Sequence, residues 1–103
     1  KCLATDKTGV LYAAENYSSD NFYLLKSTNE GITWNRMNIN IWPDIRQIMI
    51  PYKDTIFIAT WNYGVCRSTD NGNTWLQINN GIEYTKINKI FKYTHTSKLK
   101  IEV

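Results

Sequence analysis

Short runs of β-branched and aromatic residues recur along the chain, and polar turn residues separate them. In the middle of the sequence these runs occupy 45–50, 54–60, 64–69 and 73–78. Runs of this length, bounded by Gly, Pro, Asn and Asp, are typical of β-strands. The run "TIFIAT" within 54–60 is apolar almost throughout, which predicts a strand covered by protein on both faces. The pattern therefore predicts an all-β fold.

One segment also fits a helix. "KINKIFKY" (86–93) places lysines at three-residue spacing, as an amphipathic helix would. Its centre, "INKIF" (87–91), nevertheless aligns with "IRQIM" (45–49), which is bounded by Asp44 and Pro51. We therefore expect a strand here, followed by another in the similar run "KLKIEV" near the end of the sequence.

An eight-residue phrase occurs twice, as "STNEGITW" (27–34) and "STDNGNTW" (68–75), at a spacing of 41 residues. The similarity extends upstream, since "GVLYAAE" (9–15) matches "DTIFIAT" (54–60). A repeat period in this range is typical of propellers and solenoids. We expect four-stranded units at 1–40 and 41–80, with part of a third at 81–103.

A four-stranded unit leaves apolar faces exposed until neighbouring units cover them, and at least three repeats are normally needed. Two full units and part of a third are too few to close a ring. The sequence therefore predicts either the remaining units of a longer chain or self-association with further copies. Open edge strands would otherwise pair with other chains.

The repeated phrase resembles the Asp-box, also called the bacterial neuraminidase repeat, whose pattern is Ser-x-Asp-x-Gly-x-Thr-Trp. "STDNGNTW" matches this pattern fully, and "STNEGITW" has Asn29 in place of the aspartate. The resemblance implies an Asp-box β-propeller of four-stranded antiparallel blades, with each phrase forming the turn between the third and fourth strands. It implies a structural role for Ser27, Asn29, Gly31, Thr33, Trp34, Ser68, Asp70, Gly72, Thr74 and Trp75.

The residue types in the phrase suit a turn. Asp70 can accept hydrogen bonds from backbone N–H groups of its own turn, and Gly72 can adopt a positive φ. Trp75 provides a large ring to cover the sheet. A calcium loop is the alternative, but the phrase lacks the alternating acidic ligands of an EF-hand, and Asn29 is neutral. We expect a structural turn, no metal site and no cofactor.

The net charge of +3 comes entirely from residues 81–103, which hold five lysines and two glutamates. Such a lysine-rich end is typical of a solvated face, and no arginine-rich context indicates nucleic-acid binding. No apolar run is long enough for a membrane helix. The two cysteines, Cys2 and Cys66, fit unpaired buried thiols, although a bridge between them stays open. The family resemblance implies an extracellular or periplasmic protein, although the sequence contains no targeting signal.

The propeller resemblance implies that the connections 15–22, 38–45, 60–64 and 79–85 lie on the face opposite the repeated phrases. Aromatic and polar residues gather in these connections. Exposed aromatic rings beside polar groups suit stacking on sugar rings or anchoring a protein partner. The alternative is that these rings pack between units or stiffen loops. The candidate binding residues are Trp42, Asp44, Arg46, Trp61, Asn62 and Tyr63.

A glycosidase fragment is the competing interpretation, because sialidases and xyloglucan-degrading enzymes also carry Asp-boxes. A sialidase resemblance would imply an arginine triad, yet only Arg46 of the three arginines is expected near the candidate face. Glycoside hydrolysis normally uses two carboxyl groups, for which Asp44 with Glu83 or Glu15 is the only candidate set. No catalytic residue is assigned. The sequence favours a non-catalytic module for binding or scaffolding, with a glycan or a protein as ligand.

Overall fold

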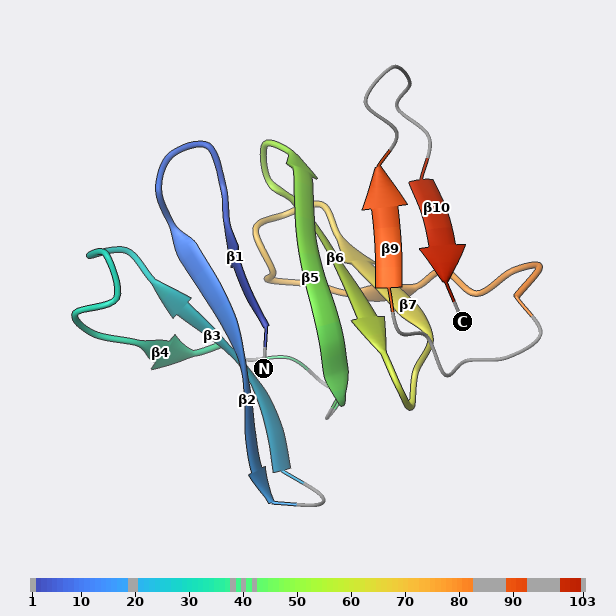
Figure 1. Cartoon of the computed structure of the whole chain (residues 1–103), viewed down its shortest axis with the longest axis horizontal. Coiled ribbons are helices and arrows are strands. Elements are labelled where there is room, and N and C mark those ends of the chain that lie inside the picture. The colour runs from blue at the N-terminus through green and yellow to red at the C-terminus, as the bar shows by residue number, and fades with distance from the viewer. Residues whose placement is uncertain are drawn as a thin grey trace.

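The computed structural model describes residues 2–18, 21–37, 39, 41, 43–82, 89–92 and 99–102. Every regular element among them is a β-strand, so the all-β prediction is confirmed. The first sheet is antiparallel, with its four strands paired in chain order (Figure 1). Its strands are β1 (Leu3–Thr5), β2 (Leu11–Ser18), β3 (Asn21–Ser27) and β4 (Asn35–Arg36).

The second sheet has the same order and direction of strands as the first. Its members are β5 (Ile45–Tyr52), β6 (Thr55–Thr60), β7 (Val65–Ser68) and β8 (Leu76–Gln77). A final antiparallel pair contains β9 (Lys89–Lys92) and β10 (Leu99–Glu102). The expectation of a strand within 87–91 is therefore confirmed over the helical alternative.

Two predicted boundaries were wrong. The fourth strand of the second sheet was expected at 73–78 but covers only Leu76–Gln77. The cause is local, because the N–H groups of Asn73 and Thr74 bind the Asp70 carbonyl and carboxylate instead of a neighbouring strand. The segment 15–22 was expected as a connection, yet most of it extends the β2–β3 hairpin.

A shared apolar core lies between the two sheets. Tyr12 and Leu24 from the first sheet cluster with isoleucines of β5 and β6 from the second. A second cluster, formed by Phe57, Ala59 and Val65, occupies the opposite face of the second sheet. Successive side chains of a strand point to opposite faces, so β6 contributes to both clusters. The expectation that "TIFIAT" is covered on both faces is confirmed.

The sheets follow one another in space as they do along the chain. Strand β5 contacts β1 and β2 on one side and β9 on the other (Figure 1). The first strand of each sheet therefore lies beside the first strand of the next. No helix in the described part of the chain has the length and apolar character that crossing a bilayer requires.

Both cysteines are free, with Cys66 fully buried and Cys2 half-buried. Burial raises the pKa of the Cys66 thiol to about 11, and burial also raises the pKa of Cys2. A thiol reacts as its thiolate, which burial disfavours. The sequence left open whether Cys2 and Cys66 form a disulfide, and in the structure both thiols are unpaired.

Candidate functional site

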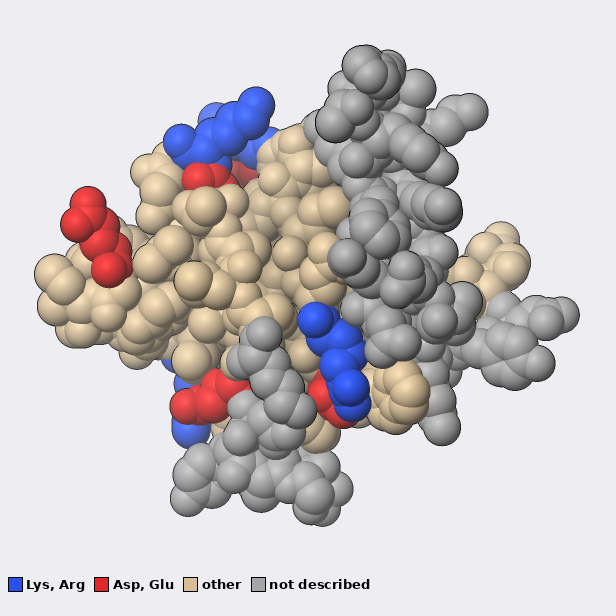
Figure 2. All heavy atoms as spheres, in the orientation of Figure 1, with Lys and Arg blue, Asp and Glu red and all other residues tan. Residues whose placement is uncertain are grey.

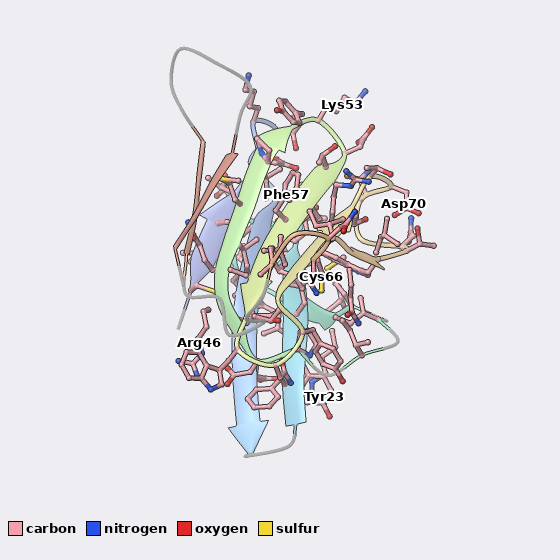
Figure 3. All side chains as sticks on the ribbon, turned by 90° about the vertical axis from the view of Figure 1, so that its right-hand side faces the viewer. Tyr23, Arg46, Lys53, Phe57, Cys66 and Asp70 are labelled. Atoms are coloured by element: carbon pink, nitrogen blue, oxygen red, sulfur yellow. The ribbon has the colours of Figure 1, made fainter. Side chains whose placement is uncertain are left out.

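The second sheet has two chemically different ends. Figure 3 shows Lys53 at one end of the β5–β6 hairpin and Arg46 at the other, with Asp70 on the turn between β7 and β8. The repeated phrases lie in the β3–β4 and β7–β8 connections. The candidate binding residues Asp44, Arg46, Trp61 and Asn62 gather at the Arg46 end.

The two repeated phrases form the same hydrogen-bonded turn. In the second copy, the buried Ser68 hydroxyl donates to Asp70 (2.8 Å) and accepts from the Gly72 N–H (2.7 Å). The indole N–H of Trp75 donates to the Gly72 carbonyl at 3.0 Å. The corresponding distances in the first copy are 3.0, 2.8 and 3.1 Å, between the residues Ser27, Asn29, Gly31 and Trp34.

A left-handed residue precedes the glycine in each turn, and sequence reasoning missed it. Asn71 has φ 60° and Gly72 has φ 89°, while Glu30 has φ 62° and Gly31 has φ 84°. Asparagine tolerates this region, whereas a residue such as glutamate is disfavoured there. The Asn–Gly pair at 71–72 is a signal that could have revealed it, because both residue types favour positive φ. Glu30 carries no such signal.

The Asp-to-Asn difference between the copies reverses one hydrogen bond. The Thr74 hydroxyl donates to the Asp70 carboxylate, whereas the Asn29 amide donates to the Thr33 hydroxyl (2.7 Å). In both turns the remaining side-chain oxygen accepts the threonine N–H at 2.9 Å. A neutral amide thus closes the same turn as a carboxylate, which favours a structural role over cation binding.

Hydrogen bonds from the Thr74 hydroxyl and N–H, with a further one from Ser68, lower the pKa of Asp70 to about 2 from its ordinary 3.8. Because the pKa is lower in the folded state, the ionised carboxylate stabilises the fold at pH values above about 4. This contribution is lost as the pH falls from about 4 through about 2.

We expect acid to destabilise the wild-type protein more than the Asp70→Asn variant, whose turn does not titrate. Urea unfolding at about pH 5 and about pH 3 measures this difference directly. Other carboxylates, including Asp6, titrate equally in both proteins, so the comparison isolates Asp70. Equal losses of stability on acidification would contradict the assignment of the low pKa to this turn.

At the other end, Arg46 joins Asp44 and Trp61 in one cluster. Its Nε and Nη2 atoms donate to the two Asp44 carboxylate oxygens at 3.2 and 2.9 Å. Its guanidinium lies over the Trp61 ring, 4.8 Å from the ring centre. Ile45 pairs with Thr60 and Gln47 with Ala59, so Arg46 is the extra residue of a β-bulge. Bulges commonly re-aim a side chain next to functional sites.

Backbone hydrogen bonds hold the cluster together. The Asp44 N–H donates to the Asn62 side-chain oxygen at 2.9 Å, and the Trp61 N–H donates to the Asp44 carbonyl at 2.9 Å. The turn itself is fixed by the buried Thr60 hydroxyl, which accepts from the Tyr63 N–H and donates to the Gly64 carbonyl. The residue Trp61 remains 37% exposed on this fixed turn.

The other two candidate residues differ from this cluster. The Tyr63 side chain packs against the core between the sheets. This position agrees with the alternative interpretation, in which the aromatic rings pack between units. Its backbone carbonyl accepts a hydrogen bond from the Asn79 amide. Trp42 lies outside the described residues. The structure therefore brings together Asp44, Arg46, Trp61 and Asn62.

The first sheet carries a similar trio that sequence reasoning did not single out. The Arg36 guanidinium lies 3.9 Å from the centre of the Tyr23 ring and pairs with Glu15 at 3.1 Å. Strand pairing brings the three together, because Glu15 lies opposite Tyr23 on adjacent strands. No short-range spacing in the sequence reveals this, since 21 residues separate Glu15 from Arg36.

The side chains at these sites offer aromatic surface, paired charges and hydrogen-bonding atoms. In the described part of the chain, no three His, Cys, Asp or Glu side chains gather as metal ligands. The two carboxylates considered for hydrolysis that the structure describes, Asp44 and Glu15, each pair with an arginine. Comparison with protein-family models, curated proteins and solved structures finds no match to this chain.

Proposed function

We propose that this chain is a non-catalytic binding module built from Asp-box propeller blades, and that it recognises a glycan or a protein through the cluster at Asp44, Arg46, Trp61 and Asn62. The observation that carries the proposal is the Arg46 guanidinium, held against the Trp61 ring and paired with Asp44. Tryptophan and arginine are the residue types most enriched at energetically dominant contacts.

Three features support the propeller part of the proposal. Both sheets have the strand order of a propeller blade, and the repeated phrase occupies the same turn in each. The first strands, β1 and β5, are neighbours, as they are around a propeller axis. The two sheets also pack against each other through an apolar cluster that contains residues of both. The remaining blades would come from a longer chain or from other copies of this chain. The proposed location of the protein is outside the cell or in the periplasm.

The cluster suits a ligand that offers both a flat apolar surface and hydrogen-bonding groups. An exposed indole stacks on the C–H face of a sugar ring or on an apolar side chain. The Asp44–Arg46 pair is bidentate, and the guanidinium has further N–H donors for hydroxyl or carbonyl groups of a ligand. Because the turn is already fixed by hydrogen bonds, binding loses little conformational entropy.

No described contact favours the glycosidase alternative. Glycoside hydrolysis normally uses two carboxyl groups that flank one glycosidic bond, whereas each described candidate is paired with an arginine. Asp44 has Arg46 at 2.9 Å and Glu15 has Arg36 at 3.1 Å. These pairs support the binding interpretation.

Replacing Trp61 with alanine is expected to weaken ligand capture by about tenfold or more, because it removes the stacking surface and the ring that positions Arg46. The measurement is binding to an immobilised glycan panel and to a protein-partner screen. Arg46→Gln should give a comparable loss. Leu76→Ala, which removes another exposed apolar side chain, serves as the control and should bind normally. Unchanged capture by both site variants would exclude this cluster as the binding site.

A further inference from the structure

A second surface lies at the opposite end of the second sheet from Arg46. A groove of about 440 Å³ runs between the β1–β2 turn and the β5–β6 turn, so both sheets contribute to it. Its interior is mainly apolar, with Val10 and Tyr12 from one sheet and Ile50 and Tyr52 from the other. This volume is within the range of about 300–1,000 Å³ that is typical of small-molecule sites.

Three lysines line this groove, namely Lys7, Lys26 and Lys53. Figure 2 shows basic side chains gathered over acidic ones at this end of the molecule. The ion pairs of the described residues involve only Arg36 and Arg46, so none of the three ammonium groups is paired with a described carboxylate. Lys26 lies 5.9 Å from the centre of the Tyr12 ring. The three lysines share the groove lining with two carboxylates, Asp6 and Asp54, so the lining has an excess of one positive charge.

The two carboxylates in the groove are engaged in other hydrogen bonds. Asp6 accepts from the Thr8 N–H (2.8 Å), the Thr8 hydroxyl (2.6 Å) and the Val10 N–H (3.0 Å). Burial tends to raise the pKa of Asp6, but these hydrogen bonds outweigh it and lower the pKa. Asp54 accepts from the Asn71 side-chain amide at 2.9 Å. Both carboxylates hold turns in place. Burial, and after it the charges of Asp6 and Asp54, raise the pKa of Tyr12. The lysines exceed the acidic groups of the groove by one charge only.

The walls of the groove are preorganised by these same turns. The Asn71 N–H donates to the Asp54 carbonyl at 3.0 Å, which joins the repeated phrase to the β5–β6 turn. The Asp6 N–H donates to the Val10 carbonyl at 3.0 Å and closes the β1–β2 turn. A site whose walls are fixed before binding loses less entropy on capturing a ligand.

We propose that this groove binds a small organic anion with an apolar body, such as an aryl carboxylate or sulfonate. The apolar part would occupy the space among Val10, Tyr12 and Ile50, and the charged group would lie among the lysines. The excess of lysines over carboxylates favours an anion, and a volume of about 440 Å³ suits a small molecule. This site is separate from the Trp61 cluster, so the two proposals stand or fall independently.

The test uses a matched pair of fluorescent probes and the full chain. The probes are 8-anilinonaphthalene-1-sulfonate and N-phenyl-1-naphthylamine, which has the same rings without the sulfonate. The sulfonate probe should bind more tightly, and Lys7→Gln/Lys53→Gln should weaken its binding by about tenfold, at roughly threefold per exposed charge pair. Binding of the uncharged probe should be unchanged. Arg36→Gln/Arg67→Gln, which removes the same charge away from the groove, is the control.

Amide NMR shifts locate the bound sulfonate probe. We expect the largest shift changes at Val10, Tyr12, Ile50 and Tyr52. The lysine variant should unfold at the same temperature as the wild type, because no described hydrogen bond or ion pair uses the side-chain nitrogen of Lys7 or Lys53. Shift changes confined to another surface, equal affinity for the two probes, an equal effect of the arginine control or no binding at all would each overturn the proposal.

Discussion

Replacing Ile58 with alanine is expected to lower the free energy of unfolding by about 3 kcal/mol. Ile58 is fully buried in the core between the sheets, with Ile48 and Cys66 opposite it on the flanking strands. Truncation removes the buried methyl groups and leaves a cavity that the rigid strands cannot fill. A domain of this size typically has about 5–15 kcal/mol of stability, so the loss is a large fraction of the total.

Urea unfolding followed by tryptophan fluorescence measures this loss. Ile32→Ala is the matched control, because Ile32 is 80% exposed and its truncation should change stability by less than about 0.5 kcal/mol. Because both sheets contribute to the core, they should unfold together. Variants that keep only Trp34 or only Trp75 should therefore show the same unfolding midpoint. An Ile58→Ala variant as stable as Ile32→Ala would contradict a core at this position.

Replacing Gly64 with alanine is expected to destabilise the protein by about 3 kcal/mol, again in urea unfolding. Gly64 has φ 72°, and a Cβ there would lie 2.7 Å from Cγ and 2.8 Å from Nδ2 of Asn79. The Asn79 side chain accepts from the Val65 N–H at 2.9 Å and donates to the Tyr63 carbonyl at 2.8 Å. If the new methyl group displaces the Asn79 side chain, the Val65 N–H and the Tyr63 carbonyl lose their hydrogen-bond partner. This cost adds to that of an alanine in the left-handed region.

Gly81→Ala separates the two contributions. Gly81 has φ 90°, but no atom of the described residues lies within 4 Å of the position that a Cβ would take there, so this variant should lose only about 1 kcal/mol. Asn79→Ala alone should also lower the free energy of unfolding. When Gly64→Ala is added to Asn79→Ala, the further loss should be about as small as that caused by Gly81→Ala, because the contact with the Asn79 side chain is already absent. Additive losses in the double variant would show that the Gly64–Asn79 contact is not the cause.

The strand pattern could be predicted where it depends on neighbouring residues. The apolar run in β6 signals a strand buried on both faces, and the second sheet's first three strands follow the predicted ranges within two residues at each boundary. The turn of the repeated phrase was also predictable, because Asp70 and Gly72 carry their own hydrogen-bonding and φ preferences.

What escaped prediction depends on residues that only the folded chain brings together. The Gly64–Asn79 contact joins positions 15 residues apart, and the Arg36–Tyr23–Glu15 trio needs the register of adjacent strands. The lysine-lined groove joins turns of different sheets. The candidate cluster at Arg46 was partly predictable from composition, but the bulge that aims Arg46 toward Trp61 was not.

Two successive four-stranded sheets of the same strand order pack against each other through an apolar core that both contribute to. Nuclear Overhauser effects between side chains test this packing most directly, in protein with labelled isoleucine and leucine methyl groups. We expect contacts from Tyr12 and Leu24 to isoleucines of the set Ile45, Ile48, Ile56 and Ile58. Contacts confined to residues of the same sheet, with none between these two groups, would contradict it.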